Sequence, residues 1–76
     1  MNKLYLIYQR EGVNYDSYDA FVISAPNTVI VRAIAYKHAG DEGGEVWKHI
    51  QYSLIKYLGN TNKKQGIILG SFNAGW

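Results

Sequence analysis

A polar and aromatic segment covering residues 14–19 holds the side chains of this 76-residue chain that are best suited to recognising a ligand. It reads Asn-Tyr-Asp-Ser-Tyr-Asp, so two phenol rings lie beside two carboxylates, an amide and a hydroxyl. Aromatic faces stack on bases, and short polar side chains read base edges through hydrogen bonds. The alternative is a turn held by Asx-type hydrogen bonds, in which the tyrosines cover a sheet. The segment supplies four candidate ligand-binding residues: Asn14, Tyr15, Asp16 and Tyr18.

Two other places in the chain are candidates for the same ligand. Ser71, Phe72 and Asn73 form a second dense group of polar and aromatic side chains, where the alternative is simple strand termination. Arg32 is expected on a helix, on the side opposite its core stripe. A guanidinium in that position is either solvated or clamps an anion.

The sequence offers no catalytic or metal-binding pattern. His38 and His49 are the two histidines, and neither lies in an H-E-x-x-H motif. The serine of Gly70-Ser71-Phe72 is not in a G-x-S-x-G elbow. The segment 40–45, Gly-Asp-Glu-Gly-Gly-Glu, lacks the Lys-Ser/Thr of a phosphate loop, and its carboxylates repel phosphate. We therefore expect a binding protein without catalytic residues, metal or cofactor.

The composition limits the kinds of partner that this chain is expected to bind. A net charge of +2 without a basic cluster argues against duplex nucleic acid as the ligand. No apolar run approaches the ~20 residues that cross a membrane, and the absence of cysteine favours an intracellular setting. The chain is short enough to form one domain, 1–76, with a small core. Because disulfides and a zinc site are excluded, we expect a homo-oligomer, a dimer or tetramer, to supply further stability.

Hydrophobic patterns predict four strands and one helix. Apolar runs predict strands at 3–9, 18–24, 50–58 and 66–72. The first and last runs are apolar on both faces, which favours central positions in the sheet. Apolar residues at helical spacing predict a helix over 29–38, although its β-branched residues leave a strand as the alternative. Asn27 or Thr28 is expected to cap that helix, and Gly40 to stop it in the left-handed conformation.

These elements predict an α+β fold in the order β-β-α-β-β, a four-stranded and mainly antiparallel sheet with one helix on a face. Residues 41–45 are expected to form a loop. If the first and fourth strands are neighbours, the hairpin after the first strand lies far from the end of the fourth. We therefore expect a neighbouring subunit to bring the two candidate segments together.

Three blocks of the sequence also resemble a widespread family of small phage proteins. The blocks are 5–9, 14–25 and 66–75, and the family carries a YLISQ…YDTYDSAVVAA opening and an ASFNAG ending. Arg32 and Trp47 fall where the family pattern has an arginine in its helix and a tryptophan after it. The similarity covers most of the chain and departs at Tyr8, where the pattern has serine, at Phe21, and around Gly43, where lengths differ.

The resemblance is to the anti-CBASS sponge family, which sequesters 3′3′-cyclic GMP-AMP as an oligomer. It implies a phage immune-evasion protein that binds this cyclic dinucleotide in the host bacterial cytoplasm without cleaving it. A two-fold protein interface would match the approximate two-fold symmetry of such a ligand. Tyrosines would stack on the bases, and Arg32 would meet a phosphate. The alternatives are a phage inhibitor that docks on a host defence protein, such as a CRISPR effector, and a structural accessory protein.

Overall fold

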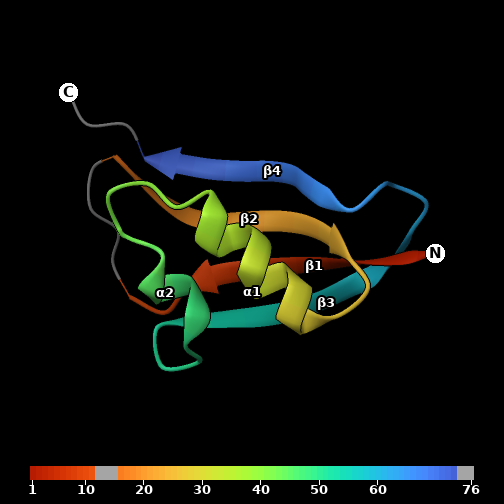
Figure 1. Cartoon of the computed structure of the whole chain (residues 1–76), viewed down its shortest axis with the longest axis horizontal. Helices are drawn as coiled ribbons and strands as arrows, with labels where there is room; N and C mark the ends of the chain where they lie inside the picture. Colours follow the sequence, from red (N-terminus) through yellow and green to blue (C-terminus); the bar gives the residue numbers. More distant parts are fainter. Residues whose placement is uncertain (12–15, 74–76) are drawn as a thin grey trace.

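An antiparallel sheet with helices on one face forms the fold in the computed structural model, which describes residues 1–11 and 16–73 (Figure 1). The strands, in the order in which they lie across the sheet, are β3 (Ser53–Thr61), β1 (Asn2–Gln9), β2 (Ser17–Ala25) and β4 (Gly66–Asn73). The helices are α1 (Thr28–Lys37) and α2 (Glu45–Lys48). Each neighbouring pair of strands runs antiparallel. The predicted α+β class is confirmed.

The helix α1 begins as its sequence predicts. The side chain of Asn27 caps it by accepting a 3.0 Å hydrogen bond from the backbone N–H of Ile30. The prediction for Gly40 is wrong, because His38 is the C-cap residue and Gly40 does not adopt a positive φ. Gly40 is instead needed for close approach, since a Cβ there would lie 2.5 Å from the backbone oxygen of Asp16.

A second helix, α2, occupies part of the predicted loop and delays the third strand. The loop prediction for 41–45 fails at Glu45, where α2 begins. The side chain of Trp47 in α2 is fully buried and packs edge-on against Phe21, with ring centroids 5.1 Å apart. After α2 the chain turns, and the backbone N–H groups of Tyr52 and Ser53 both donate to the carbonyl of His49. The strand therefore begins at residue 53 and not at 50.

The position predicted for the last strand is also wrong. β4 lies at the edge of the sheet beside β2, whereas β1 and β2 are central. The pairing of β4 with β2 contains an irregularity. Val22 pairs with Leu69 and Ile23 with Ile67, so Ile68 between them has no partner and the regular alternation of side chains between the two faces is interrupted. Ile68 and Leu69 remain 44% and 63% exposed. An apolar run alone could not distinguish this edge strand from a buried one.

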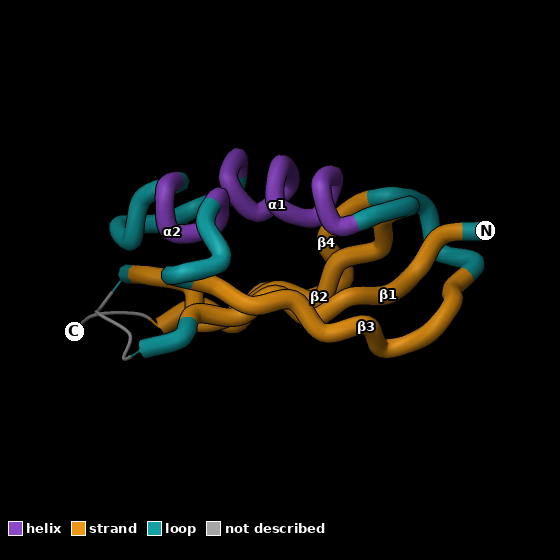
Figure 2. The backbone as a smooth tube through the Cα atoms, turned by 90° about the horizontal axis from the view of Figure 1, so that it is seen from below, coloured by secondary structure: helices purple, strands orange, loops and turns teal. Residues whose placement is uncertain are grey.

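Both helices lie on the same side of the sheet (Figure 2). The core fills the space between them, and it is built from alternate residues of β1 and β2 together with the inner faces of α1 and α2. Its buried members are Tyr5, Ile7, Phe21, Ile23, Ala25, Val31, Ala35 and Trp47.

Candidate ligand-binding site

Two of the candidate segments meet within one chain. β2 begins where β4 ends, so Ser17 pairs with Asn73 and Tyr18 pairs with Phe72. The backbone N–H of Asp16 also donates to the carbonyl of Asn73. A second subunit is therefore not required to join them, and the expectation that it would be is corrected. The strand order explains this, because β4 pairs with β2 and not with β1.

Not every candidate residue can be placed at this junction. Asn14 and Tyr15 lie outside the described residues. Ser71 pairs with Ala20 and is exposed. Asp16 is exposed and has a positive φ of 57°, a conformation that aspartate tolerates better than most residues.

The ring of Tyr18 belongs to an aromatic cluster. Its centroid lies 4.5 Å from that of Phe21 and 4.9 Å from that of Phe72. A Cβ at Gly70 would come within 2.8 Å of the same ring. The ring of Tyr18 therefore packs within the cluster at the end of the sheet. Phe72, which is 48% exposed, is the member of the cluster that faces solvent in part.

Glu42 ties the α1–α2 connection to this junction. One of its carboxylate oxygens accepts hydrogen bonds from the backbone N–H groups of Tyr18, at 3.1 Å, and Gly40, at 2.9 Å. The other accepts a 2.7 Å hydrogen bond from the indole N–H of Trp47. From the sequence, Glu42 was expected only as one of the carboxylates in a loop. Its partners lie on three different segments, so no local pattern could have revealed its role.

Gln9, which the sequence analysis did not select, links the end of β1 to the same junction. Its side-chain N–H donates a 2.7 Å hydrogen bond to the backbone oxygen of Tyr18. Gln9 closes the first of the three blocks that resemble the phage family, and Tyr18 lies in the second. All three blocks thus converge at the end of the sheet where α2 lies (Figure 1).

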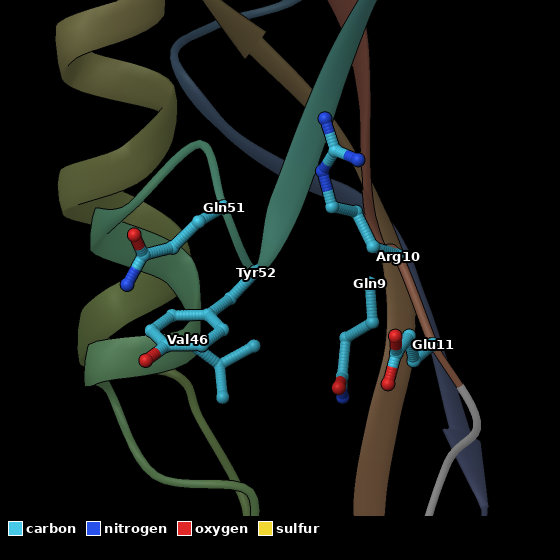
Figure 3. Close-up of a pocket in the computed structure, with 6 residues that line it drawn as sticks. All are labelled: Gln9, Arg10, Glu11, Val46, Gln51 and Tyr52. Carbon is cyan, nitrogen blue, oxygen red and sulfur yellow. The ribbon is translucent and has the colours of Figure 1, made fainter.

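A pocket of about 320 Å³ opens beside Gln9. Tyr52 and Val46 form one wall, and Gln9 and Glu11 stand opposite (Figure 3). The volume is at the lower end of the ~300–1,000 Å³ range of ligand pockets. The six lining residues are Gln9, Arg10, Glu11, Val46, Gln51 and Tyr52.

The pocket combines a ring, an amide and a guanidinium. Tyr52 is 48% exposed, so part of its ring is open to a ligand. Arg10 is held at the rim, because its Nε–H donates to the carbonyl of Ile50 at 3.0 Å and its backbone N–H donates to that of Tyr52 at 2.9 Å. Within the described part of the chain its terminal NH₂ groups have no hydrogen-bond partner. The available signal in the sequence was Gln9 at the end of a predicted strand, with Arg10 directly after it.

Arg32 does not reach this end of the site. Its guanidinium donates to the carbonyl of Trp47 at 3.0 Å, and to the hydroxyl and the carbonyl of Ser53 at 2.8 and 3.1 Å. Partial burial lowers the pKa of Arg32, but an arginine stays charged at neutral pH. Arg32 therefore fastens α1 to the end of α2 and the start of β3. It is neither simply solvated nor grouped with the aromatic candidates.

Across residues 1–11 and 16–73, no three histidine, aspartate or glutamate side chains are grouped closely enough to hold a metal ion. Over the same ranges, none of the helices has the length and apolar character needed to span a bilayer. Comparison of the chain with protein-family models, curated proteins and solved structures finds no match.

Proposed function

We propose that this protein binds a cyclic dinucleotide, with 3′3′-cyclic GMP-AMP as the first candidate, and holds it without cleaving it. The proposal makes it a phage immune-evasion protein that removes a defence signal in the host bacterial cytoplasm. One observation carries it: Gln9 joins two blocks of the family-like pattern beside a pocket that offers an aromatic ring and a guanidinium.

The pocket contains the groups that a nucleotide needs. The ring of Tyr52 would stack on a base, which stabilises binding by roughly 1–3 kcal/mol. Tyr18 engages one of the two N–H groups of the Gln9 amide, which leaves the side-chain oxygen and the other N–H for a base edge. The terminal NH₂ groups of Arg10 would meet a phosphate. A volume of about 320 Å³ suits one nucleoside half, so a symmetric ligand would occupy equivalent pockets of two copies.

The first experiment asks whether a nucleotide is bound. The protein is purified from cells that make 3′3′-cyclic GMP-AMP, denatured, and the released material is analysed by mass spectrometry. Intact cyclic nucleotide is expected. If linear product accumulates with time and protein concentration, the protein is a nuclease. If titration calorimetry with the pure nucleotide detects no binding, the proposed function is wrong.

The second experiment locates the site by calorimetry on matched variants. Tyr52→Ala should weaken binding by roughly 5- to 150-fold, the equivalent of losing one stacked base. Tyr36→Ala is its control, because Tyr36 is an exposed ring on α1. Arg10→Ala should weaken binding most at low salt, whereas Lys37→Ala should not. Folded Tyr52 and Arg10 variants that bind like the parent would exclude this pocket while leaving the function open.

The alternative, docking on a host defence protein such as a CRISPR effector, is favoured by a different surface. Val29, Ala33 and Tyr36 follow one another at helical spacing on the outside of α1, where they line an open groove of about 450 Å³. Lys37 and Lys48 border the groove, and the Lys48 ammonium lies 4.7 Å from the ring centroid of Tyr36. This surface suits an apolar segment flanked by carboxylates. Val29→Glu should abolish such docking and leave nucleotide binding unchanged.

A further inference from the structure

The face of the sheet opposite the helices carries an apolar surface. Along β1 and β2 the core residues alternate with residues that point to this other side, such as Leu6 between Tyr5 and Ile7. A hollow of about 100 Å³ on this side is bordered by Leu6, Val22 and Leu69. We call this surface the open face and define it by seven of the residues that the pairing register assigns to it: Leu6, Tyr8, Ala20, Val22, Leu54, Lys56 and Leu69.

The described chain leaves the open face without a covering layer (Figure 2). The connection between β3 and β4 reaches one corner, where the hydroxyl of Ser24 donates to the carbonyl of Lys63 at 3.0 Å. Beyond that corner Leu69 stays 63% exposed. The two central strands are therefore apolar on both sides, as in sheets covered on both faces, while α1 and α2 cover one side.

We propose that a second copy of this chain covers the open face, packing its own open face against it to give two sheets between two helical layers. The sheet has four strands of eight or nine residues, which at about 3.3 Å per residue and about 4.8 Å between strands make a face of roughly 28 by 19 Å. Its flat area is roughly 500 Å², and because side chains roughen the surface its accessible area is of the order of the ~800 Å² per partner that a stable complex buries. Facing sheets pack about 10 Å apart, and their inner side chains interdigitate. A dimer or tetramer was expected from the sequence, and in this proposal the open face is its interface.

Lys56 selects the direction of the two-fold axis. It pairs with Leu6 near the middle of β1, so an axis across the strands would bring the two Lys56 ammonium groups together along the β3 edge of the interface. An axis along the strands, between β1 and β2, sets Lys56 of each copy opposite β4 of the other, where Leu69 and Ser71 lie. Like charges in contact are unfavourable, so we assign the axis along the strands. The sheet ends that hold the Gln9 pocket then lie at the same end of the dimer.

The test is the mass of the protein in solution without nucleotide, measured by sedimentation and light scattering over a micromolar concentration series. The parent should be a dimer. Leu69→Lys should raise the dimer dissociation constant at least about 100-fold, because the two-fold axis places each new ammonium opposite Lys56 of the other copy. Val29→Lys is the matched control, since Val29 is 73% exposed on the helical side, and it should leave the dimer intact.

Each other outcome overturns the proposal. If the parent protein stays monomeric, a second copy of the chain does not cover the open face. A dimer that survives Leu69→Lys but dissociates with Val29→Lys moves the interface to α1. Circular dichroism checks the fold, and Leu69→Ser provides a milder variant that should raise the dissociation constant about tenfold if the new lysine unfolds the chain. Because no nucleotide is present, failure here leaves the proposed ligand untouched.

Discussion

The side-chain amide of Gln9 donates a 2.7 Å hydrogen bond to the backbone oxygen of Tyr18, and so joins the end of β1 to the start of β2. The last pair of the β1–β2 ladder, Tyr8 with Ala20, lies one step further into the sheet. This bond therefore extends the contact between the two central strands beyond their regular pairing. It also fixes the orientation of the amide, whose oxygen and second N–H remain at the rim of the pocket.

Gln9→Glu should lower stability. The carboxylate cannot donate at neutral pH, so the carbonyl of Tyr18 loses its partner and faces a negative charge. We expect a loss of about 1–2 kcal/mol in the free energy of unfolding, measured by urea titration. Gln65→Glu, at an exposed position between β3 and β4, is the control and should stay within about 0.5 kcal/mol of the parent. Equal effects of the two changes would show that the Gln9 bond contributes nothing specific.

Two substitutions at Tyr18 distinguish a role of its side chain in packing from a role in contacting the ligand. Tyr18→Ala removes the ring that lies between Phe21 and Phe72, so unfolding should become easier by about 2–3 kcal/mol. Tyr18→Phe keeps the ring and removes a hydroxyl with no hydrogen-bond partner in the described chain, so stability should hardly change. Thermal unfolding measures both. If Tyr18→Phe abolishes nucleotide binding while the fold is intact, the hydroxyl contacts the ligand and our description of Tyr18 as a packing residue is incomplete.

The class of fold was predictable because it depends on local patterns. Apolar runs predicted β1 and β2, and Asn27 or Thr28 before an apolar helical stripe predicted the start of α1. The order of the strands was not predictable, because β4 has the same apolar run that a central strand would have. The helix α2 is too short for periodicity to show it, and it is held by the burial of Trp47, a tertiary effect.

The candidate site was predictable only in part for a similar reason. The pairing of Ser17 with Asn73 depends on strand order, which the sequence analysis had wrong. Gln9 and Glu42 act through backbone groups of segments distant in the chain, so their residue types alone did not mark them. Arg32 was predicted either to be solvated or to clamp an anion, and its hydrogen-bond partners are neutral oxygens of Trp47 and Ser53.

Glu42→Gln should weaken the corner where α2, β2 and the α1–α2 connection meet. An amide has one acceptor oxygen, so its NH₂ group would face either the indole N–H of Trp47 or the backbone donors of Tyr18 and Gly40. We expect a loss of about 1–3 kcal/mol, followed by the fluorescence of the buried Trp47 during urea unfolding. Glu45→Gln, at an exposed side chain with weak surface pairs, should change stability by less than about 1 kcal/mol. A Glu42 variant as stable as the parent would contradict the three-donor arrangement.

Arg32→Ala should reduce stability without touching nucleotide affinity. Its guanidinium makes three hydrogen bonds to neutral oxygens of Trp47 and Ser53, and Ser53 is fully buried, so removal leaves polar groups unsatisfied. A loss of about 2–4 kcal/mol is expected, and Arg32→Lys should recover part of it, because one ammonium cannot span the same acceptors. Lys37→Ala is the control on the same helix and should be nearly neutral. Calorimetry below the unfolding transition then measures affinity for 3′3′-cyclic GMP-AMP. If folded Arg32→Ala loses affinity in a salt-dependent way while Arg10→Ala does not, the phosphate site lies at Arg32 and the pocket beside Gln9 is not where the ligand binds.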